Sequence, residues 1–266
     1  MEKVNRVNIL FKKYFSIFKF SLKMNITFIY DYIFSIISYT IHIFVFNELW
    51  DFILKDGSLF GYEKQELIWY IIITEYITFS VTSFYKKISE MVKSGMIANM
   101  LTKPMNFILY VLSEESANML KIIINAFAAI ILGKMFGGTL IVSSDAILFF
   151  VISIIFAFII AMIIQLIIGL IAFYIEETKS IWFIIQKAQF LLVFVPIEFY
   201  GGMVQKLLML LPTTHMIYTP ATILLKYDFE NCIALLSMQI INIIVLMFVT
   251  CILYKKGVRR INVNGG

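Results

Sequence analysis

Ionisable side chains inside long apolar stretches are the residues of this sequence best placed to do chemistry. Glu75 lies in the middle of one such stretch, and Glu114, Glu115 and Lys121 lie in the next. A charge at the centre of a bilayer costs roughly 2.5–3.5 kcal/mol on insertion scales, so such residues suggest function. Glu75 has two interpretations, as a substrate or proton site and as a carboxyl that holds two helices together. The other three are interpreted as a functional site or as a structural network.

Motifs of covalent, metal and nucleotide chemistry do not occur in the sequence. It has no G-x-x-x-x-G-K-[ST] loop to hold phosphates, no H-E-x-x-H, no C-x-x-C and no G-x-S-x-G. The two histidines, His42 and His215, are far apart and are interpreted as packing or loop residues. We therefore expect no catalytic residue, metal or cofactor in this chain. Energy for uphill transport would have to come from an ion gradient or another polypeptide.

The elements that must position these groups are membrane-spanning helices. Hydrophobic residues make up 61% of the 266 residues, and the mean hydropathy is +0.91. The apolar runs are continuous and lack a period of two, which excludes a transmembrane barrel. The sequence predicts an all-α polytopic protein with one transmembrane domain, 1–266, and six spans. These spans cover about 26–50, 67–84, 106–132, 146–174, 181–198 and 231–254.

The basic residues are divided unequally between the two sides of the predicted spans. With both ends inside, the inner segments carry fifteen Lys and Arg and the outer loops carry five. This asymmetry predicts cytosolic termini in a multi-pass plasma-membrane protein. The net charge of +5 fits a membrane surface better than nucleic acid, so no nucleic-acid partner is expected. Residues 1–25 are predicted to form an amphipathic helix at the interface, the alternative being a poorly ordered basic tail.

The inner segment 85–104 has an apolar face at near-helical spacing. Gly95 breaks the predicted helix or permits close approach, and Pro104 begins the next one. A short amphipathic helix here could rest on lipid or dock into a groove of a partner. The spacing leaves both options open.

Three blocks carry a resemblance to a known family. The first is the pattern from Ile88 through Gly95 and Leu101 to Pro104, and the second is 173–177, Phe-Tyr-Ile-Glu-Glu. The third begins with Pro-Ile-Glu-Phe-Tyr at 196–200 and continues to Pro220. Together, over essentially the whole chain, they resemble the membrane subunit of an ABC-2 type exporter, in a branch long classed as uncharacterised. Gly201-Gly202 stands where that branch usually has a proline-containing outer turn, which puts the shape of the outer cap in doubt.

The resemblance implies partners and roles. Members pair with a second permease subunit, identical or homologous, and the pair sits on two ABC ATPase subunits that hold ATP and Mg. Contacts to the ATPase would come from Ile88, Glu90, Met91, Lys93, Gly95, Met96, Ile97, Leu101, Lys103, Glu176 and Glu177. The path between spans 1, 2 and 5 would include Asp31, Glu75, Phe79 and Gln189. Short re-entrant helices before the last span would form an outer cap that includes Pro196, Gly201, Gly202, Pro212 and Pro220.

The function expected from the resemblance is that of the permease subunit of an ATP-driven exporter. An apolar lining with few fixed charges suits an amphipathic cargo, such as a drug, a peptide or a lipid. One alternative is a proton-coupled secondary transporter that uses Glu75. The other is a membrane scaffold that transports nothing.

Overall fold

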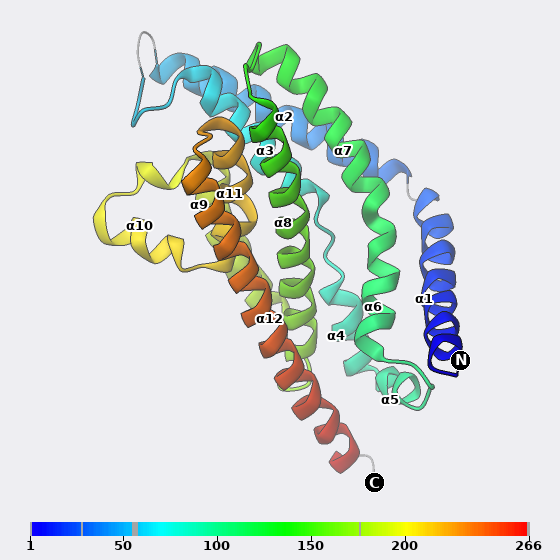
Figure 1. Ribbon diagram of the computed structural model, residues 1–266. Coiled ribbons are helices and arrows are strands. Elements are labelled where there is room, and N and C mark those ends of the chain that lie inside the picture. The colour runs from blue at the N-terminus through cyan, green and yellow to red at the C-terminus, as the bar shows by residue number, and fades with distance from the viewer. Residues whose placement is uncertain (1, 28, 55–57, 176, 265–266) are drawn as a thin grey trace.

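The computed structural model describes residues 2–27, 29–54, 58–175 and 177–264, and helices dominate this part of the chain (Figure 1). The only extended pairing within these ranges is an isolated bridge between Leu59 and Tyr62. The predicted all-helical class is confirmed. The α-helices are α1 (Glu2–Ile26), α2 (Ile29–Ile53), α3 (Lys64–Ser80), α4 (Tyr85–Lys93), α5 (Met96–Leu101), α6 (Phe107–Glu115), α7 (Met119–Leu132), α8 (Ser144–Ile171), α9 (Lys179–Phe194), α10 (Gly202–Met209), α11 (Pro212–Leu225) and α12 (Phe229–Asn264).

Five helical segments of the described chain are long and apolar enough to cross a bilayer. Bent by 100°, α10 and α11 would make a sixth if the pair counts as one span. The five are Tyr30–Ile53, Lys64–Lys93, Phe107–Gly137, Ser144–Ile171 and Phe229–Arg260. The fifth predicted span, 181–198, corresponds to α9, whose 16 residues rise about 24 Å, less than the roughly 30 Å of hydrocarbon. The bent pair confirms the short re-entrant helices predicted before the last span.

Local sequence signals explain where several spans begin. Ser143 caps α8 by accepting a hydrogen bond from the Ala146 N–H at 3.1 Å, and Asn106 caps α6 in the same way through Leu109 at 3.0 Å. Glu63 and Glu66 form a capping box at the start of α3. These side chains satisfy N–H groups that a helix leaves unpaired at its first turn.

The interior of the molecule is built around α11, which the sequence placed in an outer cap. This helix packs against α3, α8, α9 and α12, and all residues in 213–223 are buried. Gln239 of α12 fastens it by donating to the His215 carbonyl at 2.8 Å and to the Ser153 carbonyl of α8 at 3.2 Å. The helix therefore belongs to the core and not to a peripheral lid.

Small residues let α3 and the end of the α7 segment approach closely. A Cβ atom on Gly133 would lie 2.1 Å from the Trp69 ring, and one on Gly137 would lie 2.7 Å from the Trp69 indole nitrogen. Both glycines belong to a π-helical turn, Gly133–Gly137, that continues α7. The chain after the third predicted span thus begins as a helical turn, and its two glycines leave room for the large Trp69 side chain.

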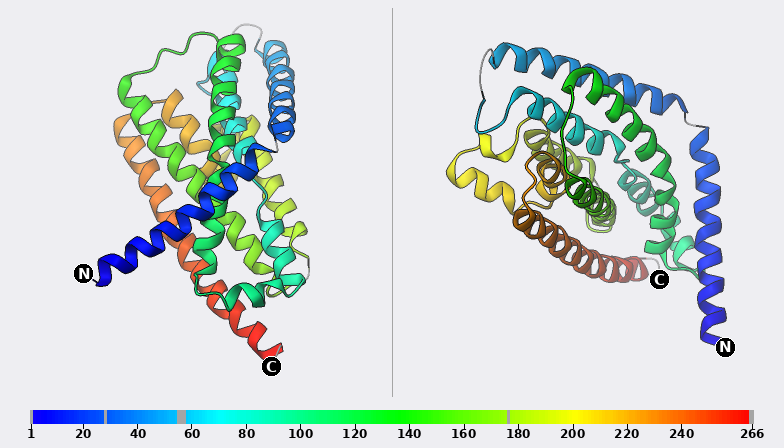
Figure 2. Two further views of the ribbon diagram at one scale, coloured as in Figure 1. Left: turned by 90° about the vertical axis from the view of Figure 1, so that its right-hand side faces the viewer. Right: turned by 45° about the horizontal axis from the view of Figure 1, so that its top comes forward.

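The N-terminal helix α1 lies beside α6 at the edge of the molecule (Figures 1 and 2). Tyr14 Oη accepts a hydrogen bond from the Asn106 N–H at 3.0 Å, and Lys13 Nζ donates to the Pro104 carbonyl at 2.6 Å. Asn25 Nδ2 donates to Asn118 Oδ1 at 3.0 Å. The predicted interfacial helix is present as a helix, and its contacts join it to the segment that follows α5.

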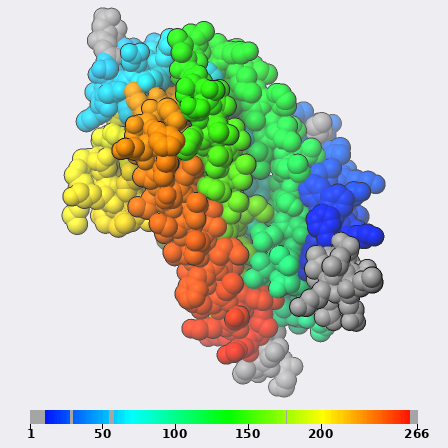
Figure 3. All heavy atoms as spheres, in the orientation of Figure 1, coloured from blue at the N-terminus to red at the C-terminus, as the bar shows by residue number. Residues whose placement is uncertain are grey.

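Most of the segments predicted to lie inside meet at one end of the molecule. The helices α4 and α5, the C-terminal ends of α8 and α12, and the start of α1 lie toward the lower end of Figure 1. The space-filling view shows α12 as a diagonal band that ends there (Figure 3). The segments 85–104 and 255–260, which carry basic residues, therefore lie at the same end as the start of α1.

Candidate functional site

A cavity of about 410 Å³ lies between α2, α3, α7 and α9. Three of the four predicted path residues, Glu75, Phe79 and Gln189, contribute to its wall. These helices correspond to the first, second, third and fifth predicted spans. The fourth path residue, Asp31, is exposed in the first turn of α2 and lines a separate hollow beside α1.

The ionisable centre of this cavity is a hydrogen-bonded pair. His42 Nδ1 of α2 lies 2.8 Å from Glu75 Oε1 of α3. The Glu75 side chain is 3% exposed, whereas that of His42 is 45% exposed. The pair joins two spans, as the structural interpretation of Glu75 requires, and it also faces a cavity, as the functional interpretation requires. His42 was missed as a site residue, although its position in an apolar span, like that of Glu75, was a usable signal.

Cations and aromatic rings make up much of the remaining wall. Lys121 and Lys187 both contribute, and the Lys187 ammonium lies 5.0 Å from the centre of the Phe183 ring and 5.7 Å from that of Phe190. Such cation–π contacts hold an ammonium against an apolar surface. The cavity therefore combines fixed charge with aromatic surface, which suits an amphipathic molecule.

Glu114 and Glu115 do not join Lys121 in one network. Glu114 pairs with Lys87 of α4. Glu115 Oε2 accepts hydrogen bonds from Thr82 and Asn118. A 3-10 turn at Ser116–Asn118 separates α6 from α7, so these residues do not follow one continuous α-helix.

The predicted coupling segment forms two short helices with a sharp break. Gly95 adopts φ +71°, a left-handed conformation that favours glycine, between α4 and α5. The apolar side chains of Ile88, Met91 and Ile97 are buried in a cluster with α6 and α8. A Cβ atom on Gly169 of α8 would come within 2.7 Å of the Ile88 Cβ. The apolar face thus packs on this chain itself, an outcome that neither of the two docking options anticipated.

The opposite face of this segment is exposed and polar. Of the predicted coupling residues, Leu101 is half-buried, and the exposed ones are Glu90, Lys93, Gly95, Met96, Lys103 and Glu177. Glu176 lies outside the described residues.

The segment also meets the link between α8 and α9. Lys93 Nζ lies 3.9 Å from Glu177 Oε2, and buried Thr178 donates a hydrogen bond to Ser89 Oγ at 3.0 Å. The Lys179 backbone N–H and the Lys93 ammonium hold the pKa of Glu177 below its ordinary value. A hollow of about 630 Å³ opens between Val92, Lys93, residues 172–175 and Glu177. The two predicted cytosolic contacts therefore form one continuous surface.

The predicted cap residues are divided between surface and interior. Gly201 and Gly202 are exposed at the start of α10, where Gly202 adopts φ +55°. Pro196 is buried before a 3-10 turn, Pro212 opens α11 and is half-buried, and Pro220 lies buried inside that helix. The described residues contain no cluster of His, Cys, Asp or Glu that could hold a metal ion.

A family model described as "ABC-2 family transporter protein" matches residues 36–265. The chain belongs to the ABC-2 transporter family. This family match covers the four described membrane-spanning segments from Lys64 onward, Tyr30–Ile53 from residue 36, α4, α5 and the link after α8. No curated protein and no solved structure matches the sequence.

Membership of the ABC-2 family makes the chain a multi-pass membrane protein and the membrane component of a transporter. The family implies ATPase partners in general. The membrane component of an ABC-2 transporter typically lacks catalytic activity of its own.

Proposed function

We propose that this ABC-2 chain is the permease subunit of an ATP-driven exporter of amphipathic cargo. The observation that carries the proposal is that the exposed residues of α4 and α5 adjoin the link after α8, through the Lys93–Glu177 contact and the buried Thr178–Ser89 hydrogen bond. The apolar side of α4 and α5 is seated on α8, so a force applied to the polar side reaches the spans directly. Two ATPase subunits, loaded with ATP and Mg, would apply that force when they close.

The cavity around Glu75 provides the second part of the proposal. It lies at the membrane-embedded junction of α2, α3 and α9, and its lysines and aromatic rings suit a molecule with charged and apolar parts. A second permease subunit, identical or homologous, would face this side and complete the path. Exposed apolar residues of α2 support such a face, including Ile33, Phe34, Ile37, Ile41 and Phe44.

The experiment measures ATP hydrolysis and cargo efflux in proteoliposomes that contain the chain and its ATPase. Lys93→Glu reverses the charge that faces Glu177, and Gly95→Trp places a large side chain at a left-handed residue. We expect each variant to reduce efflux at least about tenfold while the ATPase still hydrolyses ATP. Lys206→Glu is the matched control because Lys206 is an exposed lysine on α10, away from this surface. Efflux that persists in both coupling variants would contradict the proposal.

The His42–Glu75 pair favours a second candidate, transport driven by a proton gradient. A carboxyl 3% exposed beside an imidazole has the composition of a proton relay. In this case efflux would run without ATPase and would be lost in Glu75→Gln. Cargo movement by the chain alone in vesicles with an imposed proton gradient would establish this candidate. A membrane scaffold would show neither activity.

A further inference from the structure

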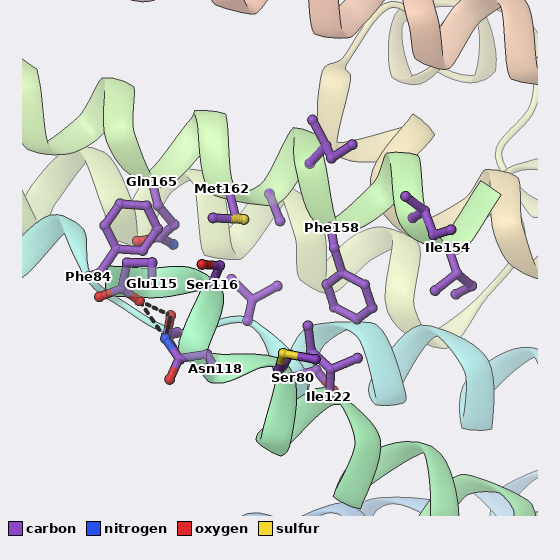
Figure 4. Close-up of a pocket in the computed structure, with 16 residues that line it drawn as sticks. Ser80, Phe84, Glu115, Ser116, Asn118, Ile122, Ile154, Phe158, Met162 and Gln165 are labelled. Atoms are coloured by element: carbon purple, nitrogen blue, oxygen red, sulfur yellow. Dashed lines mark hydrogen bonds between the residues drawn. The ribbon is translucent and has the colours of Figure 1, made fainter. Parts of the chain in front are cut away.

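A second cavity opens between α7 and α8, and Val81 alone lines both this cavity and the Glu75 site. It holds about 360 Å³ and is lined by the end of α3, the break between α6 and α7, and one side of α8 (Figure 4). A neighbouring cavity of about 330 Å³ shares Ile154 and Ile155 with it and extends to Phe150. The two form one groove along α8 from Gln165 to Phe150, about 22 Å at the helical rise per residue.

The outer wall of the groove faces the lipid. Met119, Ile155 and Ile159 are 43%, 54% and 37% exposed at its rim. A lipid chain occupies about 15 Å, half of the hydrocarbon thickness, in one leaflet. The groove is therefore long enough for one extended alkyl chain that enters sideways from the bilayer.

The polar groups gather at one end of this groove. Figure 4 shows Glu115, Asn118 and Gln165 at the end where Phe84 lies, with Phe158 and Ile154 toward the other end. Thr82 Oγ1 donates to Glu115 Oε2 at 3.0 Å, and Asn118 donates to the same oxygen. An amphiphile would thus place its head at Glu115 and its chain along α8.

The buried, unpaired amide of Gln165 is a second, independent observation that points to a ligand. Its side chain is 1% exposed, and neither its amide nitrogen nor its amide oxygen has a hydrogen-bond partner in the described part of the chain. Buried polar groups are normally satisfied, so an amide that is left unpaired at the wall of a cavity marks a place for a polar group. The amide oxygen can accept a hydrogen bond from a bound head group.

The charges around the polar end select the sign of that head group. Glu115 is the one ionisable residue that lines this cavity. The adjoining hollow adds Asp31 and Glu114 but only one lysine, Lys87, which is already paired with Glu114. Acidic side chains therefore outnumber basic ones in the walls at the polar end, which favours a cationic group there.

We propose that the groove between α7 and α8 binds a single-chain amphiphile with a protonated amine head. The ammonium donates hydrogen bonds to the Glu115 carboxylate and the Gln165 amide oxygen, and the alkyl chain lies against Ile154, Ile155 and Phe158. The proposal rests on this groove alone and is independent of ATP-driven export.

The test uses the full chain in phosphatidylcholine nanodiscs and a hexadecylamine probe with a photoactivatable diazirine near the end of its chain. We expect labelling of the α7–α8 rim, mapped by mass spectrometry. Unlabelled hexadecylamine should compete at lower concentration than hexadecanol or hexadecanoate, which share its chain length. Equal competition by all three would show ordinary lipid contact and would overturn the proposal.

Variants locate the two ends of the ligand. Glu115→Gln keeps an acceptor for Thr82 and Asn118 and removes the charge, so hexadecylamine should bind about tenfold more weakly. Glu48→Gln removes the same charge from the exposed surface of α2 and should bind as the wild type does. Unchanged binding in Glu115→Gln would overturn the assignment of the head group.

A bulky side chain at the rim of the groove tests where the alkyl chain of the ligand lies. Ile159→Trp should abolish rim labelling, whereas Leu148→Trp, also on the exposed side of α8 but outside both cavities, should not. Size-exclusion elution and thermal unfolding check that both variants fold. If Ile159→Trp fails to fold, the Glu115→Gln comparison decides the proposal by itself. Equal labelling of two folded tryptophan variants would exclude the groove.

Discussion

The His42–Glu75 pair illustrates how the role assigned to one residue depends on its hydrogen-bond partner. Glu75 was identifiable from sequence because a carboxyl in the middle of an apolar run is unusual. His42 was not identifiable as the partner of Glu75, because it belongs to a different span and the spatial distance between two spans cannot be read from a single sequence. The same limit applies to Glu114, which lies seven residues from Lys121 but pairs with Lys87.

We predict that His42→Ala lowers the stability of the chain by about 1–3 kcal/mol, because a nearly buried carboxyl loses the hydrogen bond that the structure shows. Thermal unfolding in detergent measures the loss. His42→Gln retains a donor at a similar position and should recover most of it. If the alanine and glutamine variants unfold at the wild-type temperature, the pair contributes nothing to stability.

At the scale of elements, the apolar runs were sufficient to predict most of the spans. Continuous hydrophobic segments placed α2 and α8 within a few residues of their observed bounds, and they placed the start of α12 equally well, whereas α12 continues ten residues past its predicted end at 254. The sequence failed where an element is polar but buried, as in α11, with Thr213, Thr214 and His215 in the interior. Such residues resemble a loop until the helices that satisfy them are in place.

In the coupling segment, 85–104, the local structure was predictable from the sequence but its contacts were not. Its near-helical apolar spacing predicted an amphipathic helix correctly, and the position of Gly95 predicted the break. The spacing could not say what the apolar face contacts, because lipid, a partner and the chain's own α8 offer the same chemistry. In the structure the apolar face packs on α8, where Ile88 lies against Gly169.

We predict that Gly133→Ala destabilises the chain by about 1–3 kcal/mol, because the added methyl group overlaps the Trp69 ring that packs α3 on the α7 segment. Chemical denaturation in detergent measures the change. Gly201→Ala is the matched control, since a Cβ there meets no atom within 4 Å. In a Trp69→Leu background the penalty should shrink, and a penalty that stays the same would show that the ring is not its cause.

At the scale of the whole molecule, the distribution of Lys and Arg predicts orientation. The basic segments meet at the end that carries α4, α5 and the last turns of α12 (Figure 1), which the positive-inside rule assigns to the cytosol. The opposite end carries the loop before α3 and the start of α12. This assignment remains a prediction from charge.

Cysteine labelling tests the orientation in intact cells. In a background of Cys232→Ala and Cys251→Ser, we expect Lys93→Cys to resist a membrane-impermeant maleimide and Glu230→Cys to react with it. Both positions are exposed and lie at opposite ends of the bundle, so both should react once the membrane is permeabilised. The reverse pattern in intact cells would invert the topology.

The buried position of α11 also governs how the chain must be assembled during its synthesis. Its threonines and histidine are surrounded by α3, α8, α9 and α12, yet α12, with Gln239, leaves the ribosome after it. Until that last helix arrives, the His215 carbonyl has no hydrogen bond from Gln239. We therefore expect a nascent chain cut short before residue 239 to lack the hydrogen bonds from Gln239 to α8 and α11, and to be a substrate for the quality-control proteases of the membrane.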